Sequence, residues 1–127
     1  ELYPKSNIYG FDIDLNNFEE NKKNLEKRGA FKNNNVMCYE FDQLDPDNNM
    51  KNHLKNILKN KKLDIVIDDG CHTDECILKT LENVLPFMSN KFVYFIEDNT
   101  NVHKYIKKKY PKYNIEYKNQ FTILSNF

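Results

Sequence analysis

The sequence predicts one α/β domain with a mostly parallel sheet that ends in an antiparallel hairpin. Short apolar runs alternate with polar segments in which apolar residues recur at helical spacing, a pattern typical of parallel strands joined by helices. Residues 114–124 differ, because they read as two strands joined by a tight turn. The chain has 127 residues, enough for one domain that buries roughly two-thirds of its unfolded surface.

Five apolar runs define the predicted strands. They are residues 7–13, 36–41, 63–68, 92–96 and 114–124, the last holding two strands with a turn around Lys118 and Asn119. The third and fourth runs contain the continuous apolar stretches IVI and FVYFI instead of an alternating pattern. This character predicts two central strands that are buried on both faces.

Two helices between the strands are predicted by apolar stripes with the spacing i, i+4, i+7 and i+8. The first stripe is Met50, Leu54, Ile57 and Leu58. The second is Ile77, Leu81, Val84 and Leu85, continued by Met88. We expect Thr73 to be the N-cap of the second helix, because a threonine hydroxyl accepts a hydrogen bond from a free N–H of the first turn.

Two further helices are predicted near the ends of the chain. The first covers residues 16–28, because Gly29 follows as a natural C-terminal stop. The second is a short helix that ends before Pro111 and is indicated by the spacing of Val102, Tyr105 and Ile106.

The composition excludes several classes of partner. Nineteen basic residues balance nineteen acidic ones, so no net field attracts nucleic acid or an anionic membrane. No apolar run approaches the ~20 residues that a membrane helix needs. The odd number of cysteines and the absence of a CxxC pair predict reduced thiols with a structural role in a soluble, cytoplasmic protein; they are Cys38, Cys71 and Cys76.

Acidic and amide side chains collect where the predicted strands end. In open α/β sheets ligands bind at the C-terminal ends of the strands, so we expect the functional site there. The residues at these ends are Asp12, Asp14, Asp42, Gln43, Asp45, Asp68, Asp69, Glu97 and Asp98.

Asp12 has the position of a ribose-binding carboxylate. An acidic residue at the end of such a strand, followed by a helix, commonly accepts hydrogen bonds from the vicinal hydroxyls of a ribose. The alternative is a solvated or helix-capping aspartate, which is the better interpretation for Asp14, just before the predicted helix.

The sharpest signal is the group formed by Asp69, Glu97 and Asp98. Two neighbouring strands lie ~4.8 Å apart, so their loops can share one ligand. Carboxylate oxygens select Mg²⁺, Ca²⁺ or Mn²⁺ over zinc. The alternative is two solvated acidic turns without a metal.

His72 follows Asp69 by three residues, at the start of the next helix. An imidazole near a metal-bound hydroxyl suits a general base because its ordinary pKa lies near neutrality. The alternative is a helix-entry histidine without a chemical role. We expect His53 and His103 to be surface residues, because they accompany lysine-rich helical segments.

The chain resembles a known family in the segment LDIVIDDGCHTDECILKTLENVLPFM and in FVYFIEDNT after it. These segments are similar to the fourth and fifth strand regions of metal-dependent O-methyltransferases that act on macrolide sugars, and of the related cephalosporin hydroxylase-type enzymes. IYGFDID and FDQLD match the second and third strand ends of that group. The resemblance covers nearly the whole chain. It implies the Rossmann-like sheet of class I S-adenosylmethionine-dependent methyltransferases, with seven strands of which the last is antiparallel.

The resemblance also implies roles for the residues at the strand ends. Mg²⁺ is expected on Asp69, Glu97 and Asp98, with His72 as the base. Catechol-type O-methyltransferases look similar at these positions, except that their base is a lysine where this chain has His72.

The expected cofactor, S-adenosylmethionine, uses a second set of residues. The ribose is expected on Asp12 and the adenine near Asp42 and Gln43, and Asp68 is counted with these cofactor-binding residues.

The chain departs from the family at its start. The family begins with a strand and a glycine-rich turn that holds the methionine part of the cofactor, and none of Gly10, Gly29 and Gly70 can form that turn. The absent strand would lie between the strands that end at Asp12 and Asp69, so its absence leaves two unpaired edges. We therefore expect an N-terminally truncated methyltransferase domain spanning residues 1–127.

The expected function is a Mg²⁺-dependent O-methyltransferase that acts on a hydroxyl of a sugar or similar polyol, with no nucleic-acid or membrane partner. Two alternatives stay open. One is a catalytically inactive, truncated module that binds or assembles with other molecules. The other is an NAD-binding oxidoreductase, because a carboxylate like Asp12 also suits a nicotinamide-cofactor ribose. The methyl acceptor and the oligomeric state are not defined by the sequence.

Overall fold

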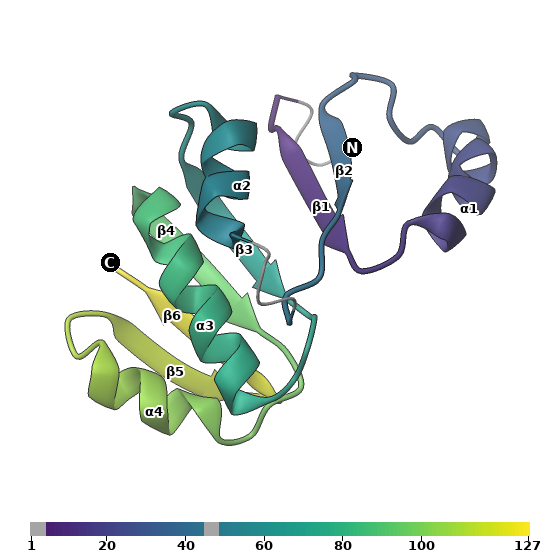
Figure 1. Ribbon diagram of the computed structural model, residues 1–127. Helices are drawn as coiled ribbons and strands as arrows, with labels where there is room; N and C mark the ends of the chain where they lie inside the picture. Colours follow the sequence, from purple (N-terminus) through teal and green to yellow (C-terminus); the bar gives the residue numbers. More distant parts are fainter. Residues whose placement is uncertain (1–4, 45–48) are drawn as a thin grey trace. The chain divides into compact units, whose positions relative to one another are not determined.

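The computed structural model describes residues 5–44 and 49–127. Asp45, one of the acidic residues at the predicted strand ends, lies outside the described residues. The chain divides into two compact units, Glu1–Asp42 and Gln43–Phe127. Figure 1 shows the elements of both units, which are described separately below.

The first unit is a parallel strand pair joined by a helix. Strand β1 (Ile8–Asp12) pairs with β2 (Val36–Glu40) in the register Ile8 to Val36 and Asp12 to Glu40. Helix α1 (Asn16–Lys27) connects them, and Gly29 follows it with φ of +92°. This left-handed conformation ends a helix readily in glycine, so the predicted stop is confirmed.

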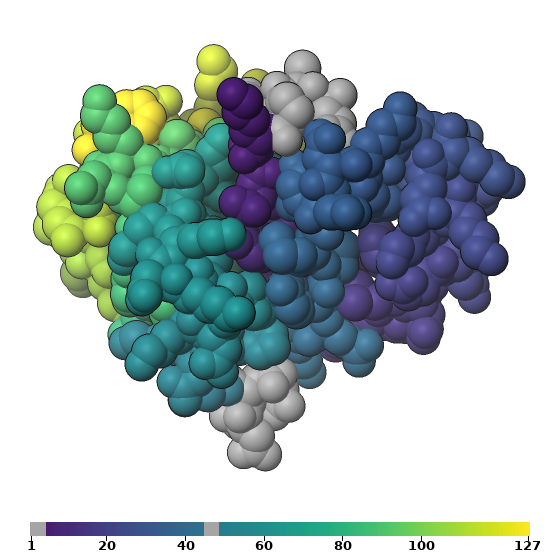
Figure 2. All heavy atoms as spheres, turned by 90° about the horizontal axis from the view of Figure 1, so that it is seen from above, coloured from purple at the N-terminus to yellow at the C-terminus, as the bar shows by residue number. Residues whose placement is uncertain are grey.

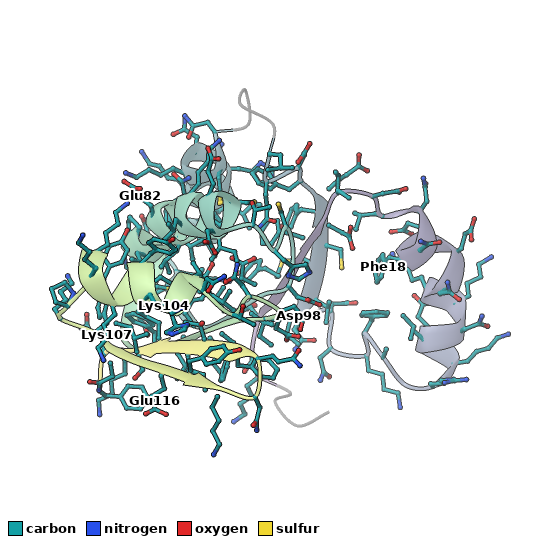
Figure 3. All side chains as sticks on the ribbon, turned by 90° about the horizontal axis from the view of Figure 1, so that it is seen from below. Phe18, Glu82, Asp98, Lys104, Lys107 and Glu116 are labelled. Carbon is teal, nitrogen blue, oxygen red and sulfur yellow. The ribbon has the colours of Figure 1, made fainter. Side chains whose placement is uncertain are left out.

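Packing in the first unit is loose. Among residues 5–42 none is buried. The ring of Phe18, on the inward side of α1, meets that of Phe31 edge to face, with 5.8 Å between centroids (Figure 3). A hollow of about 530 Å³ lies between α1 and β2, and its lining includes Glu19 and Cys38.

The second unit contains a four-stranded sheet in the order β3-β4-β6-β5. Strands β3 (Leu63–Asp68) and β4 (Met88–Ile96) are parallel neighbours, as predicted. Strands β5 (Asn114–Lys118) and β6 (Phe121–Ser125) form the predicted antiparallel hairpin, and β6 also pairs antiparallel with β4.

The hairpin turn consists of Asn119 and Gln120, one residue later than predicted. Their φ angles are +51° and +70°. A two-residue turn with φ above zero at both positions matches the right-handed twist of the strands that it joins.

Four helical segments complete the second unit: α2 (Met50–Leu58), α3 (Asp74–Val84), the 3-10 helix η1 (Leu85–Phe87) and α4 (Val102–Lys109). The N-cap of α3 is Thr73, whose Oγ1 accepts a hydrogen bond from the N–H of Cys76 at 3.3 Å, as predicted. Helix α4 ends before Pro111, which is also as predicted.

One helix boundary was predicted wrongly. The apolar stripe of α3 was extended to Met88, but the α-helix ends at Val84 and Met88 begins β4. The cause is Pro86, which lacks an N–H donor and cannot continue an α-helix. The chain therefore passes through the 3-10 turn η1, in which Pro86 is an early residue.

The core of the second unit lies between its helices and one face of the sheet. Figure 2 shows the atoms of this unit, coloured teal to yellow, on one face of the molecule. Its largest fully buried apolar side chains come from α2, α3, α4 and the central strands: Tyr94, Leu58, Ile77, Leu81, Ile96, Ile106, Leu124 and Val102.

The expectation that β3 is buried on both faces was wrong. Ile65 is 59% exposed and Ile67 is 63% exposed, whereas Asp68, on the opposite face, is buried. Strand side chains alternate between the two faces, so only one face of β3 is covered. The apolar run in the sequence therefore predicts the strand correctly, but it does not show whether other residues bury its second face.

Two histidines also differ from expectation. His53 and His103 were predicted at the surface, but both are half-buried. The imidazole of His103 stacks on the ring of Tyr117, with 4.7 Å between centroids.

None of the described helices has the length and apolar character needed to cross a membrane.

Candidate metal centre

The candidate site lies on two loops that leave the sheet side by side. Strands β3 and β4 are parallel, and their last paired residues are Asp68 and Ile96. One further hydrogen bond, from the N–H of Glu97 to the carbonyl of Asp68 at 3.0 Å, continues the pairing. The loops after β3 and β4 therefore begin at the same edge of the sheet.

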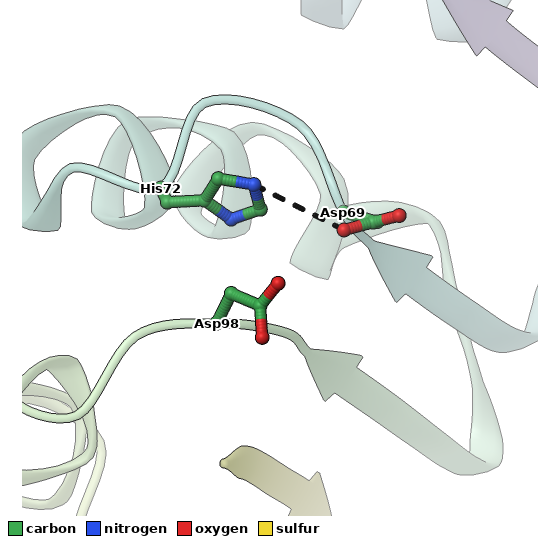
Figure 4. Close-up of side chains that lie close together, drawn as sticks. All are labelled: Asp69, His72 and Asp98. Atoms are coloured by element: carbon green, nitrogen blue, oxygen red, sulfur yellow. Dashed lines mark ion pairs between the residues drawn. The ribbon is translucent and has the colours of Figure 1, made fainter.

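Asp69, His72 and Asp98 form a cluster at this edge. Each offers one ligand atom, and these atoms lie within 4.8 Å of one another. The Nε2 atom of His72 is 4.0 Å from Oδ1 of Asp69, and the carboxylate of Asp98 faces the imidazole (Figure 4). All three side chains are exposed.

The donor set fits a divalent cation. Nitrogen and oxygen ligands bind at ~2.0–2.2 Å, so two ligands of one ion lie at most ~4.4 Å apart. The three exposed side chains need only small rotations to reach this spacing from 4.8 Å. Two carboxylates and an imidazole suit Mg²⁺ or Mn²⁺, and the imidazole alone adds affinity for transition metals.

Glu97 is not part of this cluster. It was predicted as a ligand together with Asp98, but it is half-buried, and only Asp98 brings an oxygen near Asp69 and His72. The backbone turns between them, because Asp98 has φ of +52°. A left-handed conformation in a residue other than glycine is uncommon and often occurs at functional sites.

Asp68 directly precedes Asp69 of the cluster, and its carboxylate is hydrogen-bonded to other residues of the protein. Its Oδ1 accepts a hydrogen bond from Nε2 of Gln43 at 3.2 Å, and its Oδ2 accepts one from the hydroxyl of Tyr94 at 3.1 Å. Burial raises the pKa of Asp68, although the bonds from Gln43 and Tyr94 oppose that shift. Both of its oxygens therefore have protein partners.

Gln43 ties the loop after β3 to the helical layer. Its Nε2 also donates to Oγ1 of Thr80 at 3.2 Å, and its Oε1 accepts the N–H of Cys71 at 2.9 Å. A Cβ atom at Gly70 would collide with this Oε1. Gly70 thus permits a close approach by Gln43, and the predicted roles of Gln43 and Asp68 in cofactor binding stay predictions.

The two cysteines near the site have different environments. Cys71 is half-exposed, and a hydrogen bond with Thr73 lowers its pKa. Cys76 is buried, and this burial raises its pKa to about 12. Burial also raises the pKa of Cys38 in the first unit.

The remaining predicted residues belong to the first unit. Asp12 is the last residue of β1 and is exposed, and its Oδ1 accepts the N–H of Asp14 at 3.3 Å. Oδ1 of Asp14 accepts the N–H of Asn16 at 2.8 Å, but the N-cap of α1 is Leu15, so Asp14 lies one residue before the cap position that was predicted for it. Asp42 follows β2 and is half-buried. The cofactor roles of Asp12 and Asp42 stay predictions.

One residue of the site was missed in the sequence. Asn99 follows Asp98 directly and is buried, at 8% exposure. The sequence feature that could have indicated Asn99 is its position three residues before Val102, the first residue of α4. Asparagine is a preferred residue near helix starts.

The described residues have a Rossmann-like α/β fold. Two solved structures share it, both of the MycE methyltransferase from the mycinamycin biosynthetic pathway. One is in complex with Mg and SAH, with a TM-score of 0.64, and the other holds Mg, SAH and mycinamycin VI, with a TM-score of 0.66. Each has 17% sequence identity and covers 96% of this chain.

The likeness covers a limited part of the neighbour. The chain spans 37% of the first of these structures and 36% of the second. No protein-family model and no curated protein sequence matches the chain.

Proposed function

We propose that the chain is part of an S-adenosylmethionine-dependent, Mg²⁺-dependent O-methyltransferase that acts on a hydroxyl of a sugar or similar polyol. The observation that carries the proposal is the cluster of Asp69, His72 and Asp98 at the ends of two adjacent parallel strands. It is supported by the methyltransferase fold, since both neighbours were solved with Mg and SAH.

Asp69 and Asp98 would hold the metal ion. The role of Glu97 as a third carboxylate stays a prediction, because its side chain lies outside the cluster. A divalent ion at this site supplies a Lewis acid that lowers the pKa of a bound hydroxyl. Since the side chains of Asp69 and Asp98 are exposed, the acceptor hydroxyl and water can reach the same point.

His72 is the proposed general base. Its Nε2 lies 4.0 Å from Asp69 Oδ1, so the imidazole lies directly beside a carboxylate of the proposed metal site. His72 would take the proton of the acceptor hydroxyl, and S-adenosylmethionine would supply the methyl group. The contribution of the protein to the rate is then mainly the alignment of the reacting atoms.

Candidates for cofactor binding are found among the described residues of the first unit. Asp12 is exposed, and its Oδ1 accepts the N–H of Asp14, while Gln43 and Asp68 are hydrogen-bonded to residues inside the second unit. Gly70 faces Gln43 closely, and Gly29 ends α1, so neither forms a glycine-rich turn. We propose ribose binding by Asp12 and adenine binding near Asp42 as the part of the cofactor site that this chain contributes.

The metal half of the proposal is tested by titrating the protein with Mn²⁺ and Mg²⁺ in a calorimeter. We expect saturable binding that Asp69→Asn weakens strongly. The matched control is Asp64→Asn, because Asp64 is an exposed aspartate near the opposite end of the same strand. Equal binding by wild type and Asp69→Asn would contradict the assignment.

The catalytic half is tested by methyl transfer to sugar hydroxyls with labelled S-adenosylmethionine. We expect His72→Ala to lower turnover by about two to four orders of magnitude, the usual contribution of a general base, while Mg²⁺ affinity changes little, because Mg²⁺ prefers carboxylate oxygens to an imidazole. Unchanged turnover in His72→Ala would exclude this residue as the base.

A second candidate is a catalytically inactive module that binds another molecule through the same fold. Exposed Ile65 and Ile67 favour it, because neighbouring apolar side chains on an exposed sheet face are typical of a surface that a binding partner covers. This candidate predicts metal binding without any thermal shift on addition of S-adenosylmethionine. A thermal shift would favour the methyltransferase.

A further inference from the structure

Asn99 is a buried amide whose hydrogen-bonding capacity is fully used. Its Nδ2 donates to the carbonyl of His72 at 2.9 Å and to Oδ1 of Asp74 at 2.8 Å. Its Oδ1 accepts the N–H groups of Asn101 and Val102, both at 2.8 Å. An asparagine side chain has two N–H donors and an oxygen with two lone pairs, so no capacity is left for a ligand.

These four bonds join the two loops of the candidate metal centre. The Nδ2 side reaches the loop that carries Asp69 and His72, and the Oδ1 side holds the first turn of α4. The loops are also tied at the sheet edge by the bond between Glu97 N–H and the carbonyl of Asp68. Asp98 lies between these two ties, so its position relative to His72 is set from both sides.

The backbone of Asp98 needs this support. Its φ of +52° is unfavourable for a residue with a side chain, and such conformations persist where the surrounding bonds determine them. The hydrogen bonds of Asn99, the next residue, fix the chain directly after it. They hold the turn that points the Asp98 carboxylate toward the imidazole in Figure 4.

We propose that Asn99 is a positioning residue for a divalent cation, which holds Asp98 opposite Asp69 and His72 before the ion binds. The inference rests on the metal site of the proposed function and adds the residue that preorganises it. Preorganised ligands bind more tightly because the loops lose less freedom on binding. Partners behind the metal ligands typically change affinity by 10–100-fold when they are replaced.

If Asn99 had only a structural role, it would act as a cap for helix α4. One substitution separates this capping role from the positioning of Asp98. Asn99→Asp keeps an oxygen that accepts the N–H groups of Asn101 and Val102, so the start of α4 stays capped. It replaces the Nδ2 donor by a second acceptor, which faces the carbonyl of His72 and the carboxylate of Asp74. The link between the loops is then lost while the cap remains.

The experiment is a calorimetric titration of the full chain with Mn²⁺. We expect Asn99→Asp to weaken Mn²⁺ binding by roughly 10–100-fold. The matched control is Asn101→Asp, which adds the same charge at an exposed residue of the same loop and leaves the bonds to His72 intact. We expect its affinity to stay within about threefold of wild type, because surface charge pairs contribute little.

A second pair of variants covers the case in which Asn99→Asp does not fold. In Asn99→Asp with Asp74→Asn, the new amide at position 74 can donate to the new carboxylate, so we expect part of the lost affinity to return. Asp74→Ala removes one acceptor of Asn99 without adding charge, and we expect a smaller loss. Circular dichroism melts of each variant show whether the fold is kept.

The outcomes distinguish the two proposals. If wild type binds Mn²⁺ and folded Asn99→Asp binds it equally well, the positioning role is wrong and the metal site stands. If Asn99→Asp does not fold and Asp74→Ala keeps wild-type affinity, the positioning role is also wrong. If wild type binds no Mn²⁺, the metal site itself is wrong, and the positioning role with it.

Discussion

The chain contains two strand-helix-strand arrangements with the same parallel pairing but very different interiors. In β1-α1-β2 the helix buries no side chain, and a hollow of about 530 Å³ lies between α1 and β2. In β3-α3-β4 the helix buries five residues, and its core includes Leu81 and Tyr94. The helix sequences explain the contrast, since NNFEENKKNLEK has two apolar residues and DECILKTLENV has a full apolar stripe.

Backbone pairing alone does not make a stable unit. Most of the stability of a helix in a protein comes from packing its apolar face. The candidate metal centre lies wholly in the unit that has such a core, whereas the ribose candidate Asp12 belongs to the other unit. We therefore expect the candidate metal centre to be more rigid than the strand end that carries Asp12.

The largest expected effect is on amide hydrogen exchange. Amides of β4 and β6 should exchange only through global unfolding, which costs about 5–15 kcal/mol in small domains, whereas amides of β1 and β2 should exchange through local opening at a few kcal/mol or less. The measurement is native-state exchange by NMR at increasing denaturant. Equal protection of the two strand pairs would contradict the difference in packing between the two units.

The next effect is on core packing. Leu81→Ala removes a fully buried side chain from α3 and should lower the free energy of unfolding by about 2–5 kcal/mol. Phe18→Ala, on α1, removes a half-buried ring beside a hollow and should cost about 1 kcal/mol or less. Urea denaturation followed by circular dichroism measures both. A larger loss for Phe18→Ala would show that the first unit has the more important core.

The sequence predicted the features that local chemistry decides. The bounds of β3, the stop at Gly29 and the cap at Thr73 follow from apolar runs, from a left-handed glycine and from a hydroxyl acceptor. The hairpin was found as well, although its turn was placed one residue early. Each of these features depends on residues within about four positions of one another.

The rest depends on residues far apart in the sequence. Gln43 bonds Asp68 and Thr80, which are 25 and 37 residues away, and Asn99 bonds the carbonyl of His72 at a separation of 27. Periodicity carries no information on such partners. The same limit applies to Ile65, because an apolar strand pattern does not say whether anything covers its second face.

A smaller effect compares two glycines, one in each unit. A Cβ atom at Gly70 would collide with Gln43 Oε1, while at Gly10 it would meet only the sulfur of Cys38 at 3.4 Å. Gly70→Ala should therefore cost about 1–3 kcal/mol and displace the loop that carries Asp69. Gly10→Ala should be neutral or slightly stabilising, because alanine restricts the unfolded chain. Thermal melts of the two variants test the contrast, and equal melting temperatures would contradict the close packing of Gln43 on Gly70.

The smallest effect is the pH dependence that Asp68 gives to stability. Burial raises the pKa of its carboxyl in the folded state, so the folded protein holds the proton more tightly than the unfolded chain does. The resulting stability is fully present below about pH 4, the ordinary range of an aspartate, and is lost as the pH rises through the higher folded value.

Asp68→Asn should remove this dependence. The amide stays neutral, and its oxygen can still accept the Nε2–H of Gln43. Relative to wild type, the variant should gain stability as the pH rises from about 4, with a slope of at most about 1.4 kcal/mol per pH unit. Urea denaturation at several pH values measures the difference. Asp12→Asn, at an exposed aspartate of the other unit, is the matched control for the loss of one carboxyl group. If the free energy of unfolding of Asp68→Asn instead follows the same pH dependence as that of wild type, burial does not control the pKa of this carboxyl. The difference in packing between the two units then does not extend to the residue beside the metal centre.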